Sequence, residues 1–137
     1  MEVYFNSKKI KDNQTIKLED VQTQPDIKYK FNPNKLYTTI MFDPDAPSKA
    51  NPINANYLHW LIVNKDDIVA PFTPSNPPQG SGPHRYFFGL FEQKNKISLS
   101  NDEMNKIKKR KKFDVNDFIK QNNLTKVASF MFMTERK

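Results

Sequence analysis

Two short stretches dominate this sequence: Asp43-Pro44-Asp45-Ala46-Pro47-Ser48 and Pro77-Pro78-Gln79-Gly80-Ser81-Gly82-Pro83-His84-Arg85-Tyr86. His59 stands between them, after a spacer of ten residues that follows the first stretch. The stretches and His59 together hold both histidines of the chain and two of its three glycines. Because proline fixes the backbone torsion φ near −65°, these polar residues are set in stiff loops. This combination predicts a rigid ligand pocket.

Eight prolines lie between positions 44 and 83, but the apolar segment Tyr57-Leu58-His59-Trp60-Leu61-Ile62-Val63 interrupts them. A segment this apolar is expected to be a buried strand. The proline-rich segments on either side are therefore expected to be ordered loops that return to that strand and form binding walls.

Period-2 alternation and short β-branched or aromatic runs predict most of the remaining secondary structure. The segment 27–31 alternates apolar residues with lysines, which is typical of an antiparallel strand with one solvated side. Apolar residues on both faces predict strands between layers at 36–42, 57–63, 85–92 and 127–133. Shorter outer strands are predicted at 3–5 and 16–18.

Helix signals occur late in the chain. Asp114 is a predicted N-cap, with Asp117 at the third helical position and Phe113 and Phe118 placed as a hydrophobic staple, so a helix is expected at about 115–122. The segment 100–103 also has the spacing of a capping box. The basic sequence that follows makes a frayed turn an equal alternative there.

Length and composition narrow the class of protein. A chain of 137 residues fits a single domain covering 1–137. It contains no cysteine, so a disulfide framework and a thiolate zinc site are excluded. Neither a signal-peptide pattern nor an apolar run of about 18 residues is found, which predicts a cytoplasmic protein without a transmembrane segment.

The net charge of +7 is concentrated in one region. Residues 94–126 carry ten basic and four acidic residues and so account for six of the seven net charges. Because this region lies outside the proline-rich motifs, it predicts contact with an anionic surface rather than a part of the pocket. The basic run consists of Lys106, Lys108, Lys109, Arg110, Lys111 and Lys112.

The basic run allows several interpretations. A solvated loop, a patch for anionic lipid head groups and a nuclear-import signal are alternatives. Nucleic-acid binding is disfavoured, since the run has no interleaved aromatic residues and no recognition-helix pattern.

Alternation along 57–63 places His59 on the same face as Leu61, opposite Leu58 and Trp60. A single histidine on an apolar face is more often a buried structural residue than a ligand, and Asp-Pro-Asp after a strand is ordinary turn chemistry. The spacing of these residues relative to the other motifs favours a ligand-binding role instead.

Taken together, these blocks resemble the phosphatidylethanolamine-binding protein family, which includes the Raf kinase inhibitor protein and the plant florigen-type proteins. The resemblance rests on the 43–48 block after an apolar strand, on His59 ten residues later, and on the 80–86 block. It is clear over about residues 27–93. The chain resembles a short member, so the family's N-terminal extension and its C-terminal helix after the last strand are expected to be missing.

The resemblance implies a mainly β fold with a large central antiparallel sheet, a smaller flanking sheet and one or two short helices late in the chain. It also implies a small cavity for phosphate-like anions and phospholipid head groups, and a cis bond before Pro47. By motif position the cavity residues are Asp43, Asp45, Pro47, Tyr57, His59, Pro78, Gly80, His84 and Tyr86.

The chemistry of these residues can be judged without the family resemblance. None of them is permanently cationic, so a phosphoryl group would be held by histidine N–H groups, the Tyr86 hydroxyl and backbone N–H groups of 80–82. Asp43 beside an imidazole would fix its tautomer, while Asp45 or the ring of Tyr57 would meet an ammonium group. Anion affinity is expected to fall as pH rises through the histidine pKa values.

Two enzymatic alternatives use the same region. A metal site is disfavoured because Pro44 and Pro47 splay the acids and no His-x-His spacing is present. A serine hydrolase would use Ser48 or Ser81, but the chain has no Gly-x-Ser-x-Gly elbow. The alternative enzyme, a small hydrolase or metal-dependent enzyme, would rely on Asp43, Asp45, His59 and His84.

The predicted function is a non-enzymatic binding protein without a cofactor. The ligand is expected to be a phosphate-containing small molecule, a phospholipid head group or a phosphorylated side chain. The family implies a kinase or serine-protease partner and a role in modulating signalling, although the fold by itself does not choose among these outputs.

Overall fold

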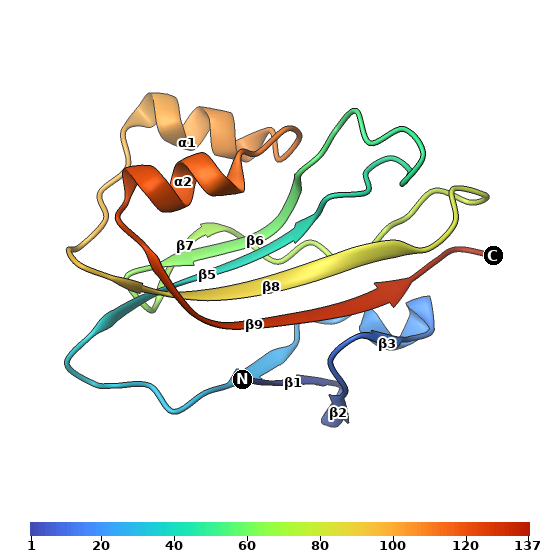
Figure 1. Cartoon of the computed structure of the whole chain (residues 1–137), viewed down its shortest axis with the longest axis horizontal. Coiled ribbons are helices and arrows are strands. Elements are labelled where there is room, and N and C mark those ends of the chain that lie inside the picture. The colour runs from blue at the N-terminus through green and yellow to red at the C-terminus, as the bar shows by residue number, and fades with distance from the viewer.

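A computed structural model describes all 137 residues and shows a central six-stranded sheet (Figure 1). The strand order is β3-β9-β8-β5-β6-β7, and every neighbouring pair is antiparallel except β3 and β9, which are parallel. The strands are β3 (Gln14–Thr15), β5 (Leu36–Asp43), β6 (Tyr57–Val63), β7 (Asp67–Ala70), β8 (His84–Gln93) and β9 (Thr125–Thr134).

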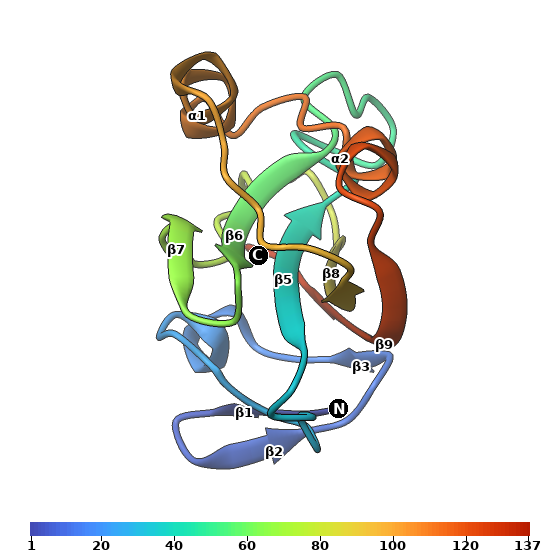
Figure 2. The ribbon, with the colours of Figure 1, turned by 90° about the vertical axis from the view of Figure 1, so that its left-hand side faces the viewer.

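A smaller antiparallel sheet with the order β2-β1-β4 covers one face of the large sheet (Figure 2). It contains β1 (Glu2–Phe5), β2 (Lys8–Ile10) and β4 (Asp26–Lys28), and the 3₁₀ helix η1 (Leu18–Val21) lies on the same side. The helices α1 (Asn101–Lys108) and α2 (Val115–Gln121) cover the opposite face. The fold is therefore the mainly β architecture that the resemblance implied.

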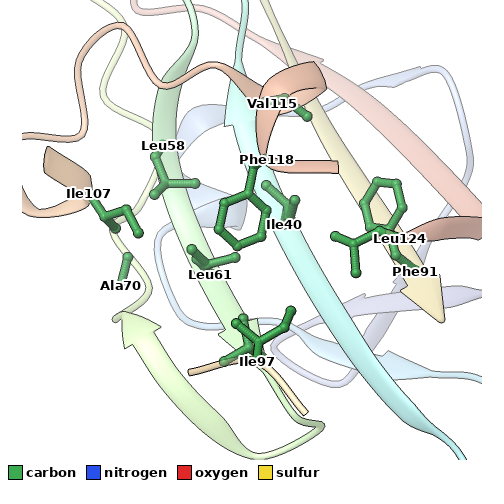
Figure 3. Close-up of a cluster of buried hydrophobic side chains, with 11 residues drawn as sticks. Ile40, Leu58, Leu61, Ala70, Phe91, Ile97, Ile107, Val115, Phe118 and Leu124 are labelled. Atoms are coloured by element: carbon green, nitrogen blue, oxygen red, sulfur yellow. The ribbon is translucent and has the colours of Figure 1, made fainter. Parts of the chain in front are cut away.

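The central strands are apolar on both faces because each face packs against another layer. On the helix side, Phe118 of α2 and Ile107 of α1 belong to one buried cluster with Ile40 and Leu61 of the sheet (Figure 3). A second buried cluster joins the other face of the sheet to the small sheet and contains Val3, Phe5, Met41, Trp60, Tyr86, Phe88 and Phe132. The two layers thus hold the long central strands firmly in register.

The strands predicted at 36–42, 57–63, 85–92 and 127–133 are confirmed as β5, β6, β8 and β9, which begin and end within two residues of the predicted bounds. The outer strand at 3–5 is confirmed as part of β1. The helix expected at about 115–122 is α2, and its predicted cap is present, since the Asp117 N–H donates to the Asp114 carboxylate at 2.9 Å.

Of the two alternatives given for 100–103, a capping box and a frayed turn, the frayed turn is wrong. A complete capping box starts α1: the Glu103 N–H donates to Ser100 Oγ and the Ser100 N–H donates to the Glu103 carboxylate, both at 3.2 Å. These bonds satisfy N–H groups that a helix start leaves open. The basic residues stand in the last turn, where positive charge favours a helix.

Two predicted strands differ from the structure. The strand at 27–31 shortens to β4, which ends at Lys28, because Tyr29 and Phe31 leave the sheet and pack edge-on against Tyr37. The strand predicted at 16–18 lies two residues earlier, as β3, and Leu18 already begins η1.

The predicted faces of β6 are also corrected. Phe42 of β5 pairs with Leu58 directly after Met41 pairs with Trp60, so His59 is an extra residue in the ladder. Such a β-bulge re-aims side chains. Leu58 therefore joins the helix-side cluster with Leu61, whereas the His59 ring contacts Tyr86 on the other face at a centroid distance of 5.3 Å.

No helix of the structure combines the length and the apolar character that crossing a bilayer requires.

Candidate functional site

A cavity of about 210 Å³ lies where β5 ends and where β6 and β8 begin. Loops 44–56 and 71–83 enclose it together with one residue of the basic run. Its lining residues are Asp43, Ala46, Pro47, Asn54, Tyr57, His59, Thr73, Pro74, Asn76, Pro78, His84, Tyr86 and Lys111. The two motifs and His59 are thus brought to one end of the sheet, and the bond before Pro47 is cis, as expected.

Two of the predicted cavity residues, Asp45 and Gly80, do not line the cavity. Gly80 and Gly82 have φ values of +80° and +81°, a conformation that glycine adopts without steric cost, and they form the turn that leads into β8. Gly80 therefore shapes the loop, and its neighbour Pro78 reaches the cavity.

Asp45 is buried, and its carboxylate is used by Arg85. The Arg85 side chain donates from Nε at 2.9 Å and from Nη2 at 2.8 Å, and the Arg85 backbone N–H donates at 2.9 Å. Burial by itself would raise the pKa of Asp45, but these hydrogen bonds from Arg85 outweigh burial and lower it. Both oxygens of the Asp45 carboxylate therefore accept hydrogen bonds from Arg85, and Asp45 is not placed to meet a ligand ammonium.

Asp43 and His84 form a buried pair beside the cavity. One oxygen of the Asp43 carboxylate lies 2.7 Å from His84 Nδ1. The other carboxylate oxygen accepts the Asp45 N–H at 2.7 Å. His84 Nε2 lies 2.9 Å from Ser81 Oγ. Asp43 thus fixes the tautomer of His84, as predicted, and both ring nitrogens of His84 have partners within the protein.

His59 differs from His84 in having a free ring nitrogen. Its Nδ1 lies 2.7 Å from the Thr73 carbonyl oxygen, which can only accept, so Nδ1 carries a proton. Nε2 is left for the cavity. Burial lowers the pKa of His59, in spite of the bond to Thr73 and the charge of Asp43, and favours the neutral ring.

Tyr86 is a buried tyrosine that lines the same cavity. Burial, and then the negative charge of Asp43, raise the pKa of Tyr86. The phenol therefore keeps its proton and is a hydrogen-bond donor. Tyr86 also stacks on His84, with ring centroids 6.2 Å apart, and this packing fixes both rings.

Lys111 was missed by sequence reasoning, which placed the basic run outside the pocket. Of the basic run only Lys111 lines the cavity, and the side chains of Lys106, Lys108, Lys109 and Lys112 are exposed, as a solvated segment requires. The backbone around Lys111 is nevertheless held in place. Arg110 and Lys112, on either side of it, adopt left-handed backbone conformations with φ of +60° and +57°. Three backbone hydrogen bonds join this segment to β6 and to the loop before it: Leu58 N–H to Arg110 O at 2.8 Å, Lys112 N–H to Asn54 O at 3.0 Å, and Phe113 N–H to Asn56 O at 2.9 Å.

Arg110 anchors this segment with its side chain. The guanidinium donates to the carbonyl oxygens of Leu58 and His59, both at 3.1 Å, and to that of Pro71 at 2.7 Å. Arg110 is thereby a positioning residue for the neighbouring Lys111. The sequence signal that could have indicated this is the position of the only arginine within a run of lysines, because a planar guanidinium suits several carbonyl acceptors at once.

The wall at 75–77 is held from behind by residues distant in sequence. Gln22 Nε2 donates to the Ser75 carbonyl oxygen at 2.9 Å. Arg136 donates to the Pro77 carbonyl oxygen at 3.2 Å and to Asn76 Oδ1 at 2.7 Å. No local sequence pattern reveals these contacts, since they span more than fifty residues.

The arrangement does not form a metal centre. No group of three or more histidine, aspartate or glutamate side chains is placed to share an ion. Asp45 is bound by Arg85, and Asp43 is bound by His84.

The phosphatidylethanolamine-binding protein family model matches residues 6–68 and 65–132. The chain belongs to this family. It is 41% identical over 141 aligned positions to a phosphatidylethanolamine-binding protein homolog of Acanthamoeba polyphaga mimivirus, which covers 98% of this chain and 96% of the viral protein. The family membership that the two motifs predicted is thus confirmed.

Other family relatives are longer. The chain is 34% identical over 97 residues to the 26 kDa secreted antigen of Toxocara canis, an alignment that covers 66% of this chain and 37% of the antigen. A Drosophila melanogaster relative is 30% identical over 108 residues, which are 74% of this chain and 51% of the relative. The chain therefore spans about half or less of these two proteins.

Solved structures of the family share the fold. The structure is similar to carboxypeptidase Y inhibitor, crystallised with its cognate proteinase, with a TM-score of 0.80, 26% identity, and coverage of 99% of this chain and 82% of the inhibitor. The phosphatidylethanolamine-binding protein from Plasmodium vivax gives a TM-score of 0.74 at 20% identity, with 98% of this chain and 85% of that chain covered.

Proposed function

We propose that this family member is a non-enzymatic binding protein whose cavity holds a phosphate-containing anion. One observation carries the proposal: Lys111, Tyr86 and His59 line the same small cavity, and the Nε2 atom of His59 has no hydrogen-bond partner in the protein. A phosphoryl group has several acceptor oxygens, and these groups are a cation, a donor and a ring that becomes a donor when protonated.

Size also favours a small ligand. A volume of about 210 Å³ corresponds to roughly seven water molecules at about 30 Å³ each. This is enough for phosphate or a phosphoethanolamine-sized head group, and it lies below the roughly 300–1,000 Å³ of pockets for drug-sized molecules.

The nearby carboxylates do not oppose an anion as strongly as their charge suggests. Asp43 is bonded by His84 and by the Asp45 N–H, and Asp45 is neutralised by Arg85. Lys111, the cation that lines the cavity, is not paired with any acid, and no acid bonds the ring of His59.

The protein is proposed to act on a protein partner. A protease partner is supported by the similarity to carboxypeptidase Y inhibitor, which was crystallised with its cognate proteinase, and the serine class is proposed from the family resemblance. A kinase partner and a signalling role follow from the family resemblance only. A cytoplasmic location stays a proposal, since one relative is described as secreted.

Isothermal titration of inorganic phosphate and O-phosphorylethanolamine tests the cavity. Wild type is expected to bind both at about pH 6, near the ordinary histidine pKa. Lys111→Ala is expected to bind roughly tenfold more weakly, the order of one charge-assisted hydrogen bond. Lys109→Ala is the matched control, since Lys109 does not line the cavity. Equal affinities in all three proteins would contradict the proposal.

One observation favours the alternative of a serine hydrolase. Ser81 Oγ lies 2.9 Å from His84 Nε2, and His84 Nδ1 lies 2.7 Å from the Asp43 carboxylate, an order of groups like that of a catalytic triad. The Ser81 hydroxyl, however, donates its one proton to the Pro78 carbonyl oxygen at 2.6 Å and not to His84 as a triad serine would. A fluorophosphonate probe separates the two functions. Labelling of wild type that is lost in Ser81→Ala would favour a hydrolase, and no labelling is expected for a binding protein.

A further inference from the structure

A second hollow, of about 430 Å³, lies between α1 and α2. Ile107, Phe113 and Phe118, residues of the helix-side core, contribute its apolar part, and exposed lysines stand around it. Lys111 lines both this hollow and the cavity described above. We name this hollow the lysine cleft. The lysines that line it are Lys106, Lys109, Lys111 and Lys112.

None of the four lysines has an ion-pair partner, although three carboxylates line the same cleft. Two of those carboxylates are already used by helix caps: Glu103 accepts the Ser100 N–H, and Asp114 accepts the Asp117 N–H. The third belongs to Asp117. The lysine cleft therefore presents unpaired positive charge next to an apolar floor.

The lysine cleft is also built on a fixed frame. The capping box defines the start of α1, and the 110–113 segment is hydrogen-bonded to β6 and to the loop before it. A ligand would thus meet charges whose backbone positions are set in advance, which lowers the entropy cost of binding.

We propose that the lysine cleft binds an acidic, extended peptide segment adjoining a phosphorylated side chain that occupies the cavity. This inference rests on the proposed function, since the phosphate must enter the cavity. Lys111 lines both sites, so the cleft is the neighbouring site for a chain that leaves the cavity past Lys111. Unpaired lysines complement acidic side chains, and the apolar floor accepts one apolar side chain.

The shape of the cleft favours a peptide over an anionic bilayer. The apolar floor lies in a hollow, which a flat membrane surface cannot reach but a side chain can enter. The carboxylates of Glu103, Asp114 and Asp117 on the same rim would repel a uniformly anionic surface, whereas a peptide places its charges at discrete positions.

Fluorescence anisotropy with matched peptides tests the inference. The probes are phosphoserine peptides with a run of glutamates before or after the phosphoserine, the same peptides with glutamines in place of the glutamates, and unphosphorylated versions. The proteins are wild type, Lys106→Ala/Lys109→Ala, and the control Lys94→Ala/Lys96→Ala. The control makes the same charge change at exposed lysines outside both the cavity and the cleft.

In wild type, one of the acidic phosphopeptides is expected to bind roughly fivefold to tenfold more tightly than its glutamine counterpart, in keeping with the modest worth of exposed ion pairs. Lys106→Ala/Lys109→Ala should lose this gain, and the control should keep it. Inorganic phosphate, titrated separately, should bind all three proteins equally, because neither Lys106 nor Lys109 lines the cavity.

The outcomes separate the inference from the proposed function. If inorganic phosphate and the glutamine-flanked phosphopeptides do not bind wild type, the proposed function fails. If they bind but acidic flanks add nothing, or the control loses the gain equally, the lysine cleft is not a peptide site. Co-sedimentation with phosphatidylserine vesicles that is lost in Lys106→Ala/Lys109→Ala, without any flank effect, would overturn the inference in favour of a membrane surface.

Discussion

At the scale of single residues, the two histidines of this family member have different roles. Both ring nitrogens of His84 bond to protein atoms, whereas His59 keeps one nitrogen for the cavity. The sequence motifs predicted the same ligand role for both histidines, because motif spacing identifies residue types but not their hydrogen-bond partners. The same limit applies to Asp45, whose long-range pairing with Arg85 removes it from the ligand set.

The pH dependence of anion binding follows from His59. Burial lowers its pKa below the ordinary value of about 6.5, so the free protein holds the ring neutral near pH 7. A bound anion favours the protonated ring, and affinity is therefore expected to rise as pH falls below about 6.5. Sulfate is the sharper probe because, unlike phosphate, it does not itself titrate near pH 6.

Isothermal titration with sulfate should show affinity that increases several-fold as the pH falls from about 7 to below the ordinary histidine pKa of about 6.5, because the His59 pKa is lowered. His59→Gln, which keeps a polar side chain but cannot become cationic, should flatten this profile. A sulfate affinity that is constant over this range in wild type would show that His59 does not provide the proton.

Asp45 is predicted to be a structural residue and not a ligand. Asp45→Asn removes the charge that Arg85 bonds and should lower the free energy of unfolding by about 1–3 kcal/mol, the range for hydrogen bonds to charged groups. Phosphate affinity should stay within about twofold, since the cavity lining is unchanged. Urea unfolding checks the first expectation and isothermal titration the second.

Asp66→Asn is the matched control for this pair, because Asp66 is exposed and forms no ion pair. A stability change in Asp45→Asn no larger than in Asp66→Asn would contradict the structural role. A large loss of phosphate affinity would return Asp45 to the ligand set.

At the scale of elements, the long central strands were predictable because their apolar residues repeat over seven or more positions. Short edge strands such as β2 and β7 carry too few residues for a period to be recognised, and they form only because a neighbouring strand supplies partners. The bulge at His59 could not be predicted for a similar reason. It is defined by the register between two strands, which alternation within one strand does not report.

The 110–113 segment is the element that connects the basic run to the cavity. Arg110→Ala removes three guanidinium hydrogen bonds to backbone carbonyls, each worth about 0.5–1.5 kcal/mol, so a loss of about 2 kcal/mol of unfolding free energy is expected. Because the same bonds hold Lys111 at the cavity, phosphate affinity should fall several-fold as well.

Lys108→Ala provides the comparison for Arg110→Ala. Lys108 belongs to the same basic run, is exposed, and lines neither hollow. Chemical denaturation and phosphate titration should therefore show a loss of stability and of phosphate affinity in Arg110→Ala but not in Lys108→Ala. If both variants lose the same small amount of unfolding free energy and of phosphate affinity, the basic run is a solvated surface only.

At the scale of the whole molecule, the cavity is assembled from parts that lie far apart in sequence. The family resemblance predicted the large sheet with a smaller flanking sheet, and a small cavity. It did not predict that Gln22 and Arg136 support the 75–77 wall from the other side. Contacts of this kind depend on the packing of η1 and the residues after β9, and they leave no local pattern.

The support from Arg136 yields a prediction at this scale. Arg136→Ala should loosen Asn76 and Pro77, weaken phosphate binding about threefold to tenfold, and change the midpoint of thermal unfolding by only a few degrees, as expected for a loss of about 1 kcal/mol. Lys137→Ala, one residue further on and without these bonds, should leave the affinity unchanged. Equal affinity in both variants would show that the wall needs no such support.

The central claim, that an anion binds at His59 in this cavity, is tested most directly by nuclear magnetic resonance of the two histidine rings. The chain has only His59 and His84, so each ring gives an assignable signal with single-site variants. During titration with inorganic phosphate at about pH 6, near the histidine pKa, the His59 Nε2 resonance is predicted to move toward the protonated form with saturation. The His84 resonances should move less. If neither ring responds while the lysine cleft residues do, the anion binds elsewhere and the account is contradicted.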